Sequence, residues 1–247
     1  MAGLCCATVI LCLISRVAAF SVATPVDAAH VRAVADELDA VLGRAEAREQ
    51  RRSAARLAAH NASGIVAPPN ELVYGELGVA ALAKLLDAVG VEQGDTFCDV
   101  GSGHGELVLA ASLLHPTLRA SRGVEIVQDL AKSASEHHAA LLQRAALPAA
   151  PIELAHGDVY DKSSPAAGML RDTTLAVCFA TTWSASGKGR VLSELSTTLH
   201  RNLPEGARVV MVDARLSDEQ FSWEGEMRLH CPDTAPFSTA HLYVQRS

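Results

Sequence analysis

The chain has 247 residues, of which 49% are hydrophobic and 20% are charged. This is the composition of a globular protein, and the length suits one large domain that follows a short leader. The formal net charge of −7 at pH 7 gives no support to nucleic-acid binding, which normally uses a basic surface. The cysteines and histidines do not follow the spacing of a zinc site, so we expect no metal.

The first 19 residues are interpreted as a leader. The apolar run from Leu4 to Ile14 has the length of a signal peptide, is too short for a comfortable transmembrane helix, and is followed by small residues before Phe20. We expect the secretory pathway, or a plastid reached through a signal peptide followed by a phenylalanine. A membrane anchor is one alternative, and a nuclear or cytoplasmic location is another if the leader is not used.

Residues 20–60 are predicted to form a helical arm. Val31, Val34 and Leu38 follow the spacing of one helix face. Beyond them, the segment Arg44–Arg56 places five arginines near two glutamates. We interpret this segment as a solvated helix face, and contact with a membrane or an acidic partner is the alternative.

Residues 61–247 are predicted to form the main domain, because glycine and prolines in the segment 61–70 break the arm. From there strands alternate with helices. The expected helices are 77–89, 106–115, 128–146 and 188–202, the expected strands are 95–100, 122–127, 152–158, 174–180 and 207–214, and a last antiparallel pair is expected at 223–231 and 240–246. The alternation predicts an α/β fold with a doubly wound, Rossmann-like sheet of seven strands and a C-terminal antiparallel hairpin.

The sequence "DVGSGHGE" follows the first of these strands and opens a helix. Gly101, Gly103 and Gly105 let a ligand lie against the backbone, at the crevice where such sheets bind ligands. A dinucleotide fingerprint would need its third glycine at position 106, which is a glutamate. The observed spacing, preceded by Asp99, is instead the version that binds S-adenosylmethionine, whose ammonium can pair with a carboxylate.

Two further acids follow the next two predicted strands. Glu125 comes about 20 residues after the glycines, where a carboxylate can accept hydrogen bonds from both ribose hydroxyls. Asp158 follows the third strand, where an acid commonly faces the adenine amino group. The alternative is that these acids only form turns, but three acids after three successive strands make a specific pattern.

The segment "VYGEL" at 73–77, ahead of "DVGSGHGE", resembles the disruptor-of-telomeric-silencing family, the non-SET histone-lysine methyltransferases within the class I seven-strand methyltransferases. The resemblance implies S-adenosyl-L-methionine as cofactor and a Tyr-Gly-Glu segment that closes over it. The residues implied to line the cofactor are Tyr74, Gly75, Glu76, Leu77, Phe97, Asp99, Gly101, Ser102, Gly103, His104, Gly105, Glu106, Glu125, Asp158 and Val159.

The chain departs from this family where the methyl acceptor binds. The family follows its fourth strand with an Asn-Asn-Phe type sequence, whereas this chain has "FATTW", with Ala180 and Thr181 at the two asparagine positions. The aromatic residues expected near Ala240 and His241 are replaced, and the basic nucleosome-binding extension is absent. We therefore expect a monomer whose substrate is an accessible lysine on a protein other than nucleosomal histone. The expected catalytic pocket residues are Thr181, Thr182, Trp183 and Glu76.

Other functions remain open. A small-molecule methyltransferase is plausible for a plastid or secretory protein, and the altered "FATTW" segment leaves room for a relative that binds the cofactor without catalysis. Trp183 can also be a core residue. An NAD-dependent oxidoreductase is disfavoured by the glycine spacing and by the lack of a Tyr-x-x-x-Lys pair.

Overall fold

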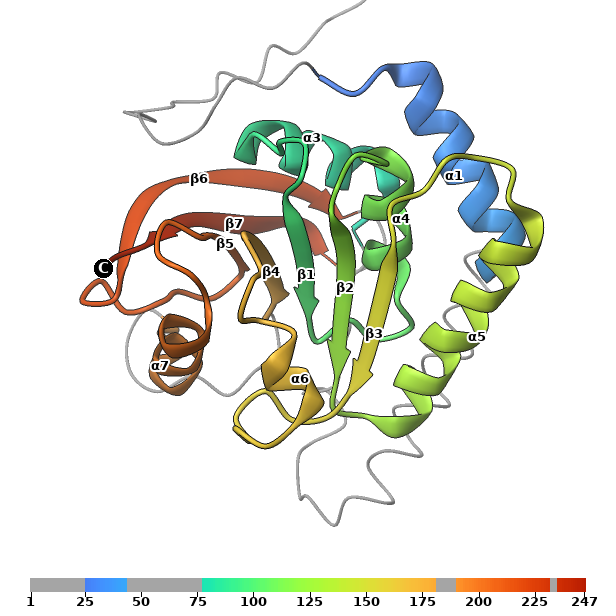
Figure 1. Ribbon diagram of the computed structural model, residues 1–247. Coiled ribbons are helices and arrows are strands. Elements are labelled where there is room, and N and C mark those ends of the chain that lie inside the picture. Colours follow the sequence, from blue (N-terminus) through green and yellow to red (C-terminus); the bar gives the residue numbers. More distant parts are fainter. Residues whose placement is uncertain (1–24, 44–76, 181–189, 232–234) are drawn as a thin grey trace, which may run out of the picture.

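The structure is a computed structural model, and it describes residues 25–43, 77–180, 190–231 and 235–247. One sheet of seven strands runs through it in the order β3-β2-β1-β4-β5-β7-β6 (Figure 1). The strands are β1 (Thr96–Val100), β2 (Ala120–Glu125), β3 (Ile152–His156), β4 (Leu175–Phe179), β5 (Arg208–Val212), β6 (Phe221–Cys231) and β7 (Ala235–Gln245). The first five are parallel, and β7 runs antiparallel to both β5 and β6. The expected seven-strand α/β fold with a C-terminal hairpin is confirmed.

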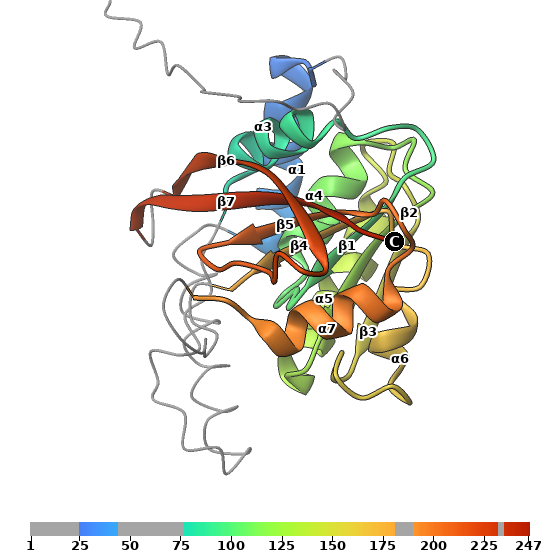
Figure 2. The ribbon, with the colours of Figure 1, turned by 90° about the vertical axis from the view of Figure 1, so that its left-hand side faces the viewer.

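Helices cover both faces of the sheet (Figures 1 and 2). One face carries α1 (Ala28–Leu42), α3 (Val79–Val89), α4 (Glu106–Leu114) and α5 (Gln128–Arg144), and the other carries α6 (Pro165–Gly168) and α7 (Ser193–Asn202). Alternate strand residues enter the two cores: in β4, Leu175 and Val177 face the first set of helices, and Ala176 and Cys178 face the second. This double burial explains why β4 is an uninterrupted hydrophobic run in the sequence.

Helix α1 shares its core with the sheet. Val34, Leu38 and Leu42 are at most 2% exposed and lie in the same hydrophobic cluster as α3, α4 and the first strands. The Arg144 guanidinium donates from Nε to Glu37 Oε1 at 2.7 Å, which ties α5 to α1. The rest of the predicted arm, with the boundary proposed near residue 61, lies outside the described residues.

Three differences from the predicted elements have local causes. Helix α7 begins at Ser193 rather than near 188, because Val191 first pairs with Arg215 in an isolated parallel bridge. The short helix α6 was not predicted; the Ser164 hydroxyl caps it by accepting a hydrogen bond from the Ala166 N–H. The hairpin strands are longer than expected because backbone pairing continues beyond the alternating pattern. In the part of the chain that the structure describes, no helix is long and apolar enough to span a membrane.

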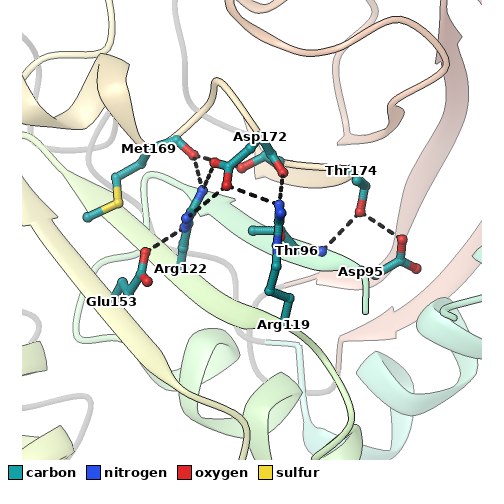
Figure 3. A network of polar contacts seen from close by, with 9 residues as sticks. Asp95, Thr96, Arg119, Arg122, Glu153, Met169, Asp172 and Thr174 are labelled. Atoms are coloured by element: carbon teal, nitrogen blue, oxygen red, sulfur yellow. Dashed lines mark hydrogen bonds and ion pairs between the residues drawn. The ribbon is translucent and has the colours of Figure 1, made fainter. Parts of the chain in front are cut away.

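The amino edge of the sheet is fixed by a network of charged and polar side chains (Figure 3). Asp95, just before β1, is paired with Arg208 and accepts a hydrogen bond from Thr174 Oγ1 at 2.7 Å. Beside it, Arg122 on β2 is paired with Asp172 and with Glu153, the latter at 2.7 Å. These contacts tie four strands and the turn before β4 together at one end of the sheet.

Candidate active site

The loop between β1 and α4 holds the three motif glycines in left-handed conformations. Their φ angles are 85° at Gly101, 53° at Gly103 and 83° at Gly105. A β-carbon at Gly105 would lie 3.0 Å from Ala134 Cβ, so the loop packs closely on α5. The N–H groups of Gly101 and Ser102 both donate to the Val124 carbonyl, at 2.9 and 3.0 Å. The loop therefore returns to β2 and starts α4 at the carboxyl edge of the sheet.

Glu125 joins the end of β2 to this loop. Its Oε2 accepts a hydrogen bond from the Gly103 N–H at 2.7 Å, and its Oε1 accepts one from the Val127 N–H at 2.8 Å. The residue is 3% exposed, and burial raises the pKa of its carboxyl, while these N–H groups act in the opposite direction. Each carboxylate oxygen has a second lone pair, so the group can accept two more hydrogen bonds from a diol.

Asp99 lies one residue before the end of β1 and is also 3% exposed. Burial raises the pKa of its carboxyl to about 8, and the nearby charge of Glu125 adds to that increase. Among the described residues, neither a cation nor a hydrogen-bond donor is paired with its carboxylate. A ligand that carries a positive charge would relieve this cost, because an opposite charge favours the ionised carboxylate.

Asp158 follows β3 and lies at the same edge of the sheet. The backbone N–H of Gly157 donates to the Glu125 carbonyl at 2.9 Å, which keeps the ends of β2 and β3 together. The Asp158 carboxylate accepts a hydrogen bond from the Tyr160 N–H at 2.8 Å, and Val159 beside it is 9% exposed. The structure thus brings the ends of three neighbouring strands together, with one acid on each.

One residue near these acids was missed in the sequence. Ile126, directly after Glu125, is a large apolar side chain that is 61% exposed at the carboxyl edge of the sheet. It offers an apolar surface where a ligand held by Glu125 continues toward β3. The expected strand at 122–127 included Ile126, whereas β2 ends at Glu125, so the sequence pattern did not indicate that this side chain is exposed.

The other predicted site residues have different positions. Phe97 and Leu77 are core residues, 0% and 2% exposed, rather than part of an open surface. The His104 ring is directed at α5, where its Nδ1 lies 2.9 Å from Ser133 Oγ. Glu106 is the first residue of α4, where an acid is favourable. Six predicted residues lie outside the described residues, namely Tyr74, Gly75, Glu76, Thr181, Thr182 and Trp183.

A cavity of about 230 Å³ lies beside this site, between α5 and the strands β2 and β3. Ser102, Gly123 and Glu125 line it, but Asp99 and Asp158 do not. It is therefore a space beside Glu125 that does not include the other two acids. A β-carbon at Gly123 would lie 2.8 Å from Ser102 Oγ and from Val108 Cγ2, so only glycine lets the loop approach β2 this closely.

Comparison with known protein families decides what this site is for. The family model "Histone methylation protein DOT1" matches residues 67–167. The resemblance expected from the sequence is confirmed over these residues, which include the glycine loop, Glu125 and Asp158. Together with the sheet order and the buried acids, the match identifies a methyltransferase domain whose cofactor is S-adenosylmethionine. The cofactor fits the residues present, since its ammonium suits Asp99 and its ribose diol suits Glu125.

Comparison with curated protein sequences finds no match. Two solved structures with a similar fold have low sequence identity to this chain. The YcgJ protein from Bacillus subtilis has 13% identity and a TM-score of 0.48, over 68% of this chain and 99% of that one. A SAM-dependent methyltransferase from Thiobacillus denitrificans, solved with S-adenosyl-L-homocysteine, has 22% identity and a TM-score of 0.39, over 58% and 49% of the two chains. These likenesses are too remote to indicate an activity.

Proposed function

We propose that the protein is a lysine N-methyltransferase that acts on a protein other than nucleosomal histone. The observation that carries this proposal is the DOT1 family match over a site with three strand-end acids. When bound, the cofactor supplies a methyl group on a sulfonium, which is an electrophile that needs no metal. The chain must then hold the cofactor, exclude water and present a neutral amine to that methyl group.

The described residues support the first of these tasks. Glu125 is held by two backbone N–H groups in an orientation that leaves lone pairs for two hydroxyl groups. Asp99 offers a buried carboxylate for an ammonium, and Ile126 an exposed apolar side chain beside them. Because these groups lie at the ends of adjacent parallel strands, a ligand can contact all of them at once.

The proposed substrate follows from charge. A nucleosome presents dense phosphate, and phosphate contacts normally supply much of the affinity for it. This chain has a formal net charge of −7, so contact with nucleosomal phosphate would depend on the arginine-rich segment at 44–56. We propose entry into the secretory pathway or a plastid through the leader, which would separate the enzyme from chromatin.

A small-molecule methyltransferase is the second candidate, and Ala180 favours it. This residue stands where the family has an asparagine, and it is 0% exposed within the core on the α7 side. An alanine cannot hydrogen-bond a lysine amine, so the family's acceptor chemistry is not reproduced at this position.

One experiment separates these candidates. The full-length protein is incubated with methyl-labelled S-adenosylmethionine and, in parallel, with reconstituted nucleosomes, with organelle proteins and with the small-molecule fraction of the same extract. Methyl-lysine in the hydrolysed organelle proteins supports the proposal. If nucleosomal histone is labelled efficiently and the organelle proteins are not labelled, the substrate argument is overturned. If the label appears only in the small-molecule fraction, the second candidate is favoured.

A further inference from the structure

A second cavity opens at the carboxyl edge of the sheet, on the opposite side of β4 from the glycine loop. Its volume is about 540 Å³, and its lining residues come from the segment before α7, from the turn after β5 and from the β6–β7 hairpin. They are Arg190, Asp213, Ala214, Arg215, Glu226, Thr239 and His241. Ligands of doubly wound sheets bind at this edge, so the cavity lies where a methyl acceptor can approach.

Two residues of this cavity have strained backbones. Arg190 and Asp213 have φ angles of 52° and 61°, in a region that side chains other than glycine's seldom adopt. The Arg190 guanidinium donates from Nη2 to the Ala180 carbonyl and from Nε to the Asp213 carbonyl, both at 2.8 Å. The cavity wall is therefore braced between the ends of β4 and β5. Strain of this kind is found mostly at functional sites.

The floor of the cavity contains a buried histidine with a carboxylate beside it. His241 on β7 pairs with Glu226 on β6, and its Nδ1 lies 3.4 Å from Glu226 Oε2. The residue is 8% exposed, and Nδ1 has no hydrogen-bond partner among the described residues. If the ring takes up a proton, the resulting imidazolium can form an ion pair with Glu226. This is the arrangement of a general base whose histidine is supported by a carboxylate.

Burial favours the neutral form of the His241 imidazole before that. Burial lowers the pKa of His241, and Arg215 lowers it further, while Glu226 and Asp213 act in the opposite direction. Arg190 also lines the cavity. The charges of Arg190 and Arg215 are balanced in the lining by those of Asp213 and Glu226, so a lysine can enter the cavity beside a carboxylate as well as beside the neutral imidazole.

We propose that His241, supported by Glu226, takes the proton that a methyl-accepting lysine in this cavity must lose. This inference rests on the proposed function and names the acceptor side of it. One N–H bond of the ammonium breaks, one N–H bond forms on the imidazole, and the electron pair stays on the lysine nitrogen as the nucleophile. The proton then passes from the imidazole to solvent.

The first test measures the histidine itself, without cofactor or substrate. The pKa of His241 is determined by NMR titration of the full-length protein, with its signal assigned from its loss in His241→Asn. We expect a pKa below the usual 6.5 of histidine, a lower value in Glu226→Gln, and a higher value in Arg215→Gln. Equal values in all three proteins would show that Glu226 and Arg215 do not act on His241 and would overturn the proposal.

The second test measures methyl-lysine formation in the organelle extract as a function of pH. A general base contributes about 100-fold or more to the rate of a reaction, so the rate of methyl-lysine formation should fall about 100-fold in His241→Asn. The decrease of the rate at acidic pH, which reports protonation of His241, should disappear in this variant. Glu226→Gln should keep a decrease that is shifted to lower pH. His138→Asn, on α5 away from the cavity, is the matched control and should leave the profile unchanged.

The outcomes separate this inference from the proposed function. If the wild-type protein forms no methyl-lysine, the proposed function fails and the inference with it. If methyl-lysine forms but the profile of His241→Asn equals that of the wild type, only the inference fails. Calorimetry with S-adenosylmethionine checks that each variant is folded, because the cavity lies apart from Glu125 and the expected dissociation constants are unchanged.

Discussion

Asp95 and Asp99 lie at opposite ends of β1, and the charged and hydrogen-bonding neighbours of their carboxylates are very different. Asp95 is paired with Arg208 and accepts hydrogen bonds from Thr174 Oγ1 and from the Glu92 N–H, both at 2.7 Å. Asp99 is as buried but lies beside Glu125, another acid, and its pKa is raised to about 8. The amino edge of the sheet satisfies its charges internally, whereas the carboxyl edge leaves them for a ligand.

This difference separates structural acids from functional ones. Unpaired buried charge lowers stability, so a fold that keeps it at one edge gives up some stability at that edge. The network around Arg122 and Asp172 (Figure 3) links β2, β3 and the turn before β4 at the other end of the sheet. Strongly shifted carboxyl groups in a crevice, by contrast, mark a binding site. The predictions below test this division, from the largest effect to the smallest.

Arg208→Ala should be the most damaging change at the amino edge. It leaves Asp95 buried without its counter-charge, since the two side chains are 12% and 10% exposed, and such a loss costs about 3–5 kcal/mol. Urea unfolding measures it. Lys132→Ala, which removes a pair with Glu136 on the exposed side of α5, should change stability by about 1 kcal/mol or less. A similar small loss in Arg208→Ala would mean that the amino edge does not depend on this pair.

Glu125→Ala should have the largest effect on cofactor binding. Hydrogen bonds to a charged group contribute about 1.5–3 kcal/mol each, so losing two ribose contacts at the lower value weakens binding by about 3 kcal/mol, on the order of 100-fold in Kd. Calorimetry with S-adenosylmethionine measures the change. Glu153→Ala, an exposed acid on β3 paired with Arg122, is the control and should bind normally. Normal binding by Glu125→Ala would place the ribose elsewhere.

The sequence allowed the strand-end acids to be predicted because their signal is local. Asp99, Glu125 and Asp158 each lie at or just after the end of an expected strand, and parallel strands bring such ends to one edge. The family resemblance placed Phe97 near the cofactor, but alternate residues of a strand face opposite sides, and the Phe97 side chain lies in the core. The strand was predictable, and the direction of that side chain was not.

The second cavity could not have been predicted in this way. His241 and Glu226 are 15 positions apart, and the hairpin register that pairs them includes an irregularity between Trp223 and Gly225. Similarly, the backbone is left-handed at Arg190 and Asp213, where the sequence has no glycine that would indicate this conformation. These features depend on backbone pairing over a distance, which residue types alone do not specify.

Asp99→Asn should change the pH dependence of stability. The folded carboxyl binds its proton up to about pH 8, whereas the unfolded one releases it above about pH 4. The folded state therefore holds more protons between these values, and stability falls as pH rises, by at most about 1.4 kcal/mol per pH unit. The free energy of unfolding without cofactor should decline less steeply in the variant than in the wild type, so that the variant is the more stable protein at pH 7.

Cofactor binding by Asp99→Asn should move in the opposite direction. An ammonium pairs with the ionised carboxylate, so wild-type affinity for S-adenosylmethionine should increase as pH approaches 8, and the variant should bind more weakly without that increase. Calorimetry at several pH values measures both proteins. Parallel pH profiles for stability and for binding would indicate that Asp99 is a structural acid like Asp95.

Asp158→Ala should have the smallest effect of the four. The Asp158 carboxylate is half-buried and already accepts a hydrogen bond from the Tyr160 N–H, so at most one further contact, to the adenine amino group, is lost. A single hydrogen bond contributes about 1 kcal/mol, or roughly fivefold in Kd.

A cofactor analogue that lacks the amino group should bind the wild type about as weakly as the variant binds S-adenosylmethionine, and the variant should not distinguish the two ligands. Asp161→Ala, in the same loop and bonded to Ser163, is the control. If Asp158→Ala weakens binding as much as Glu125→Ala does, the adenine contact contributes as much to cofactor affinity as the ribose contacts. The ranking of the two acids by their burial would then be wrong.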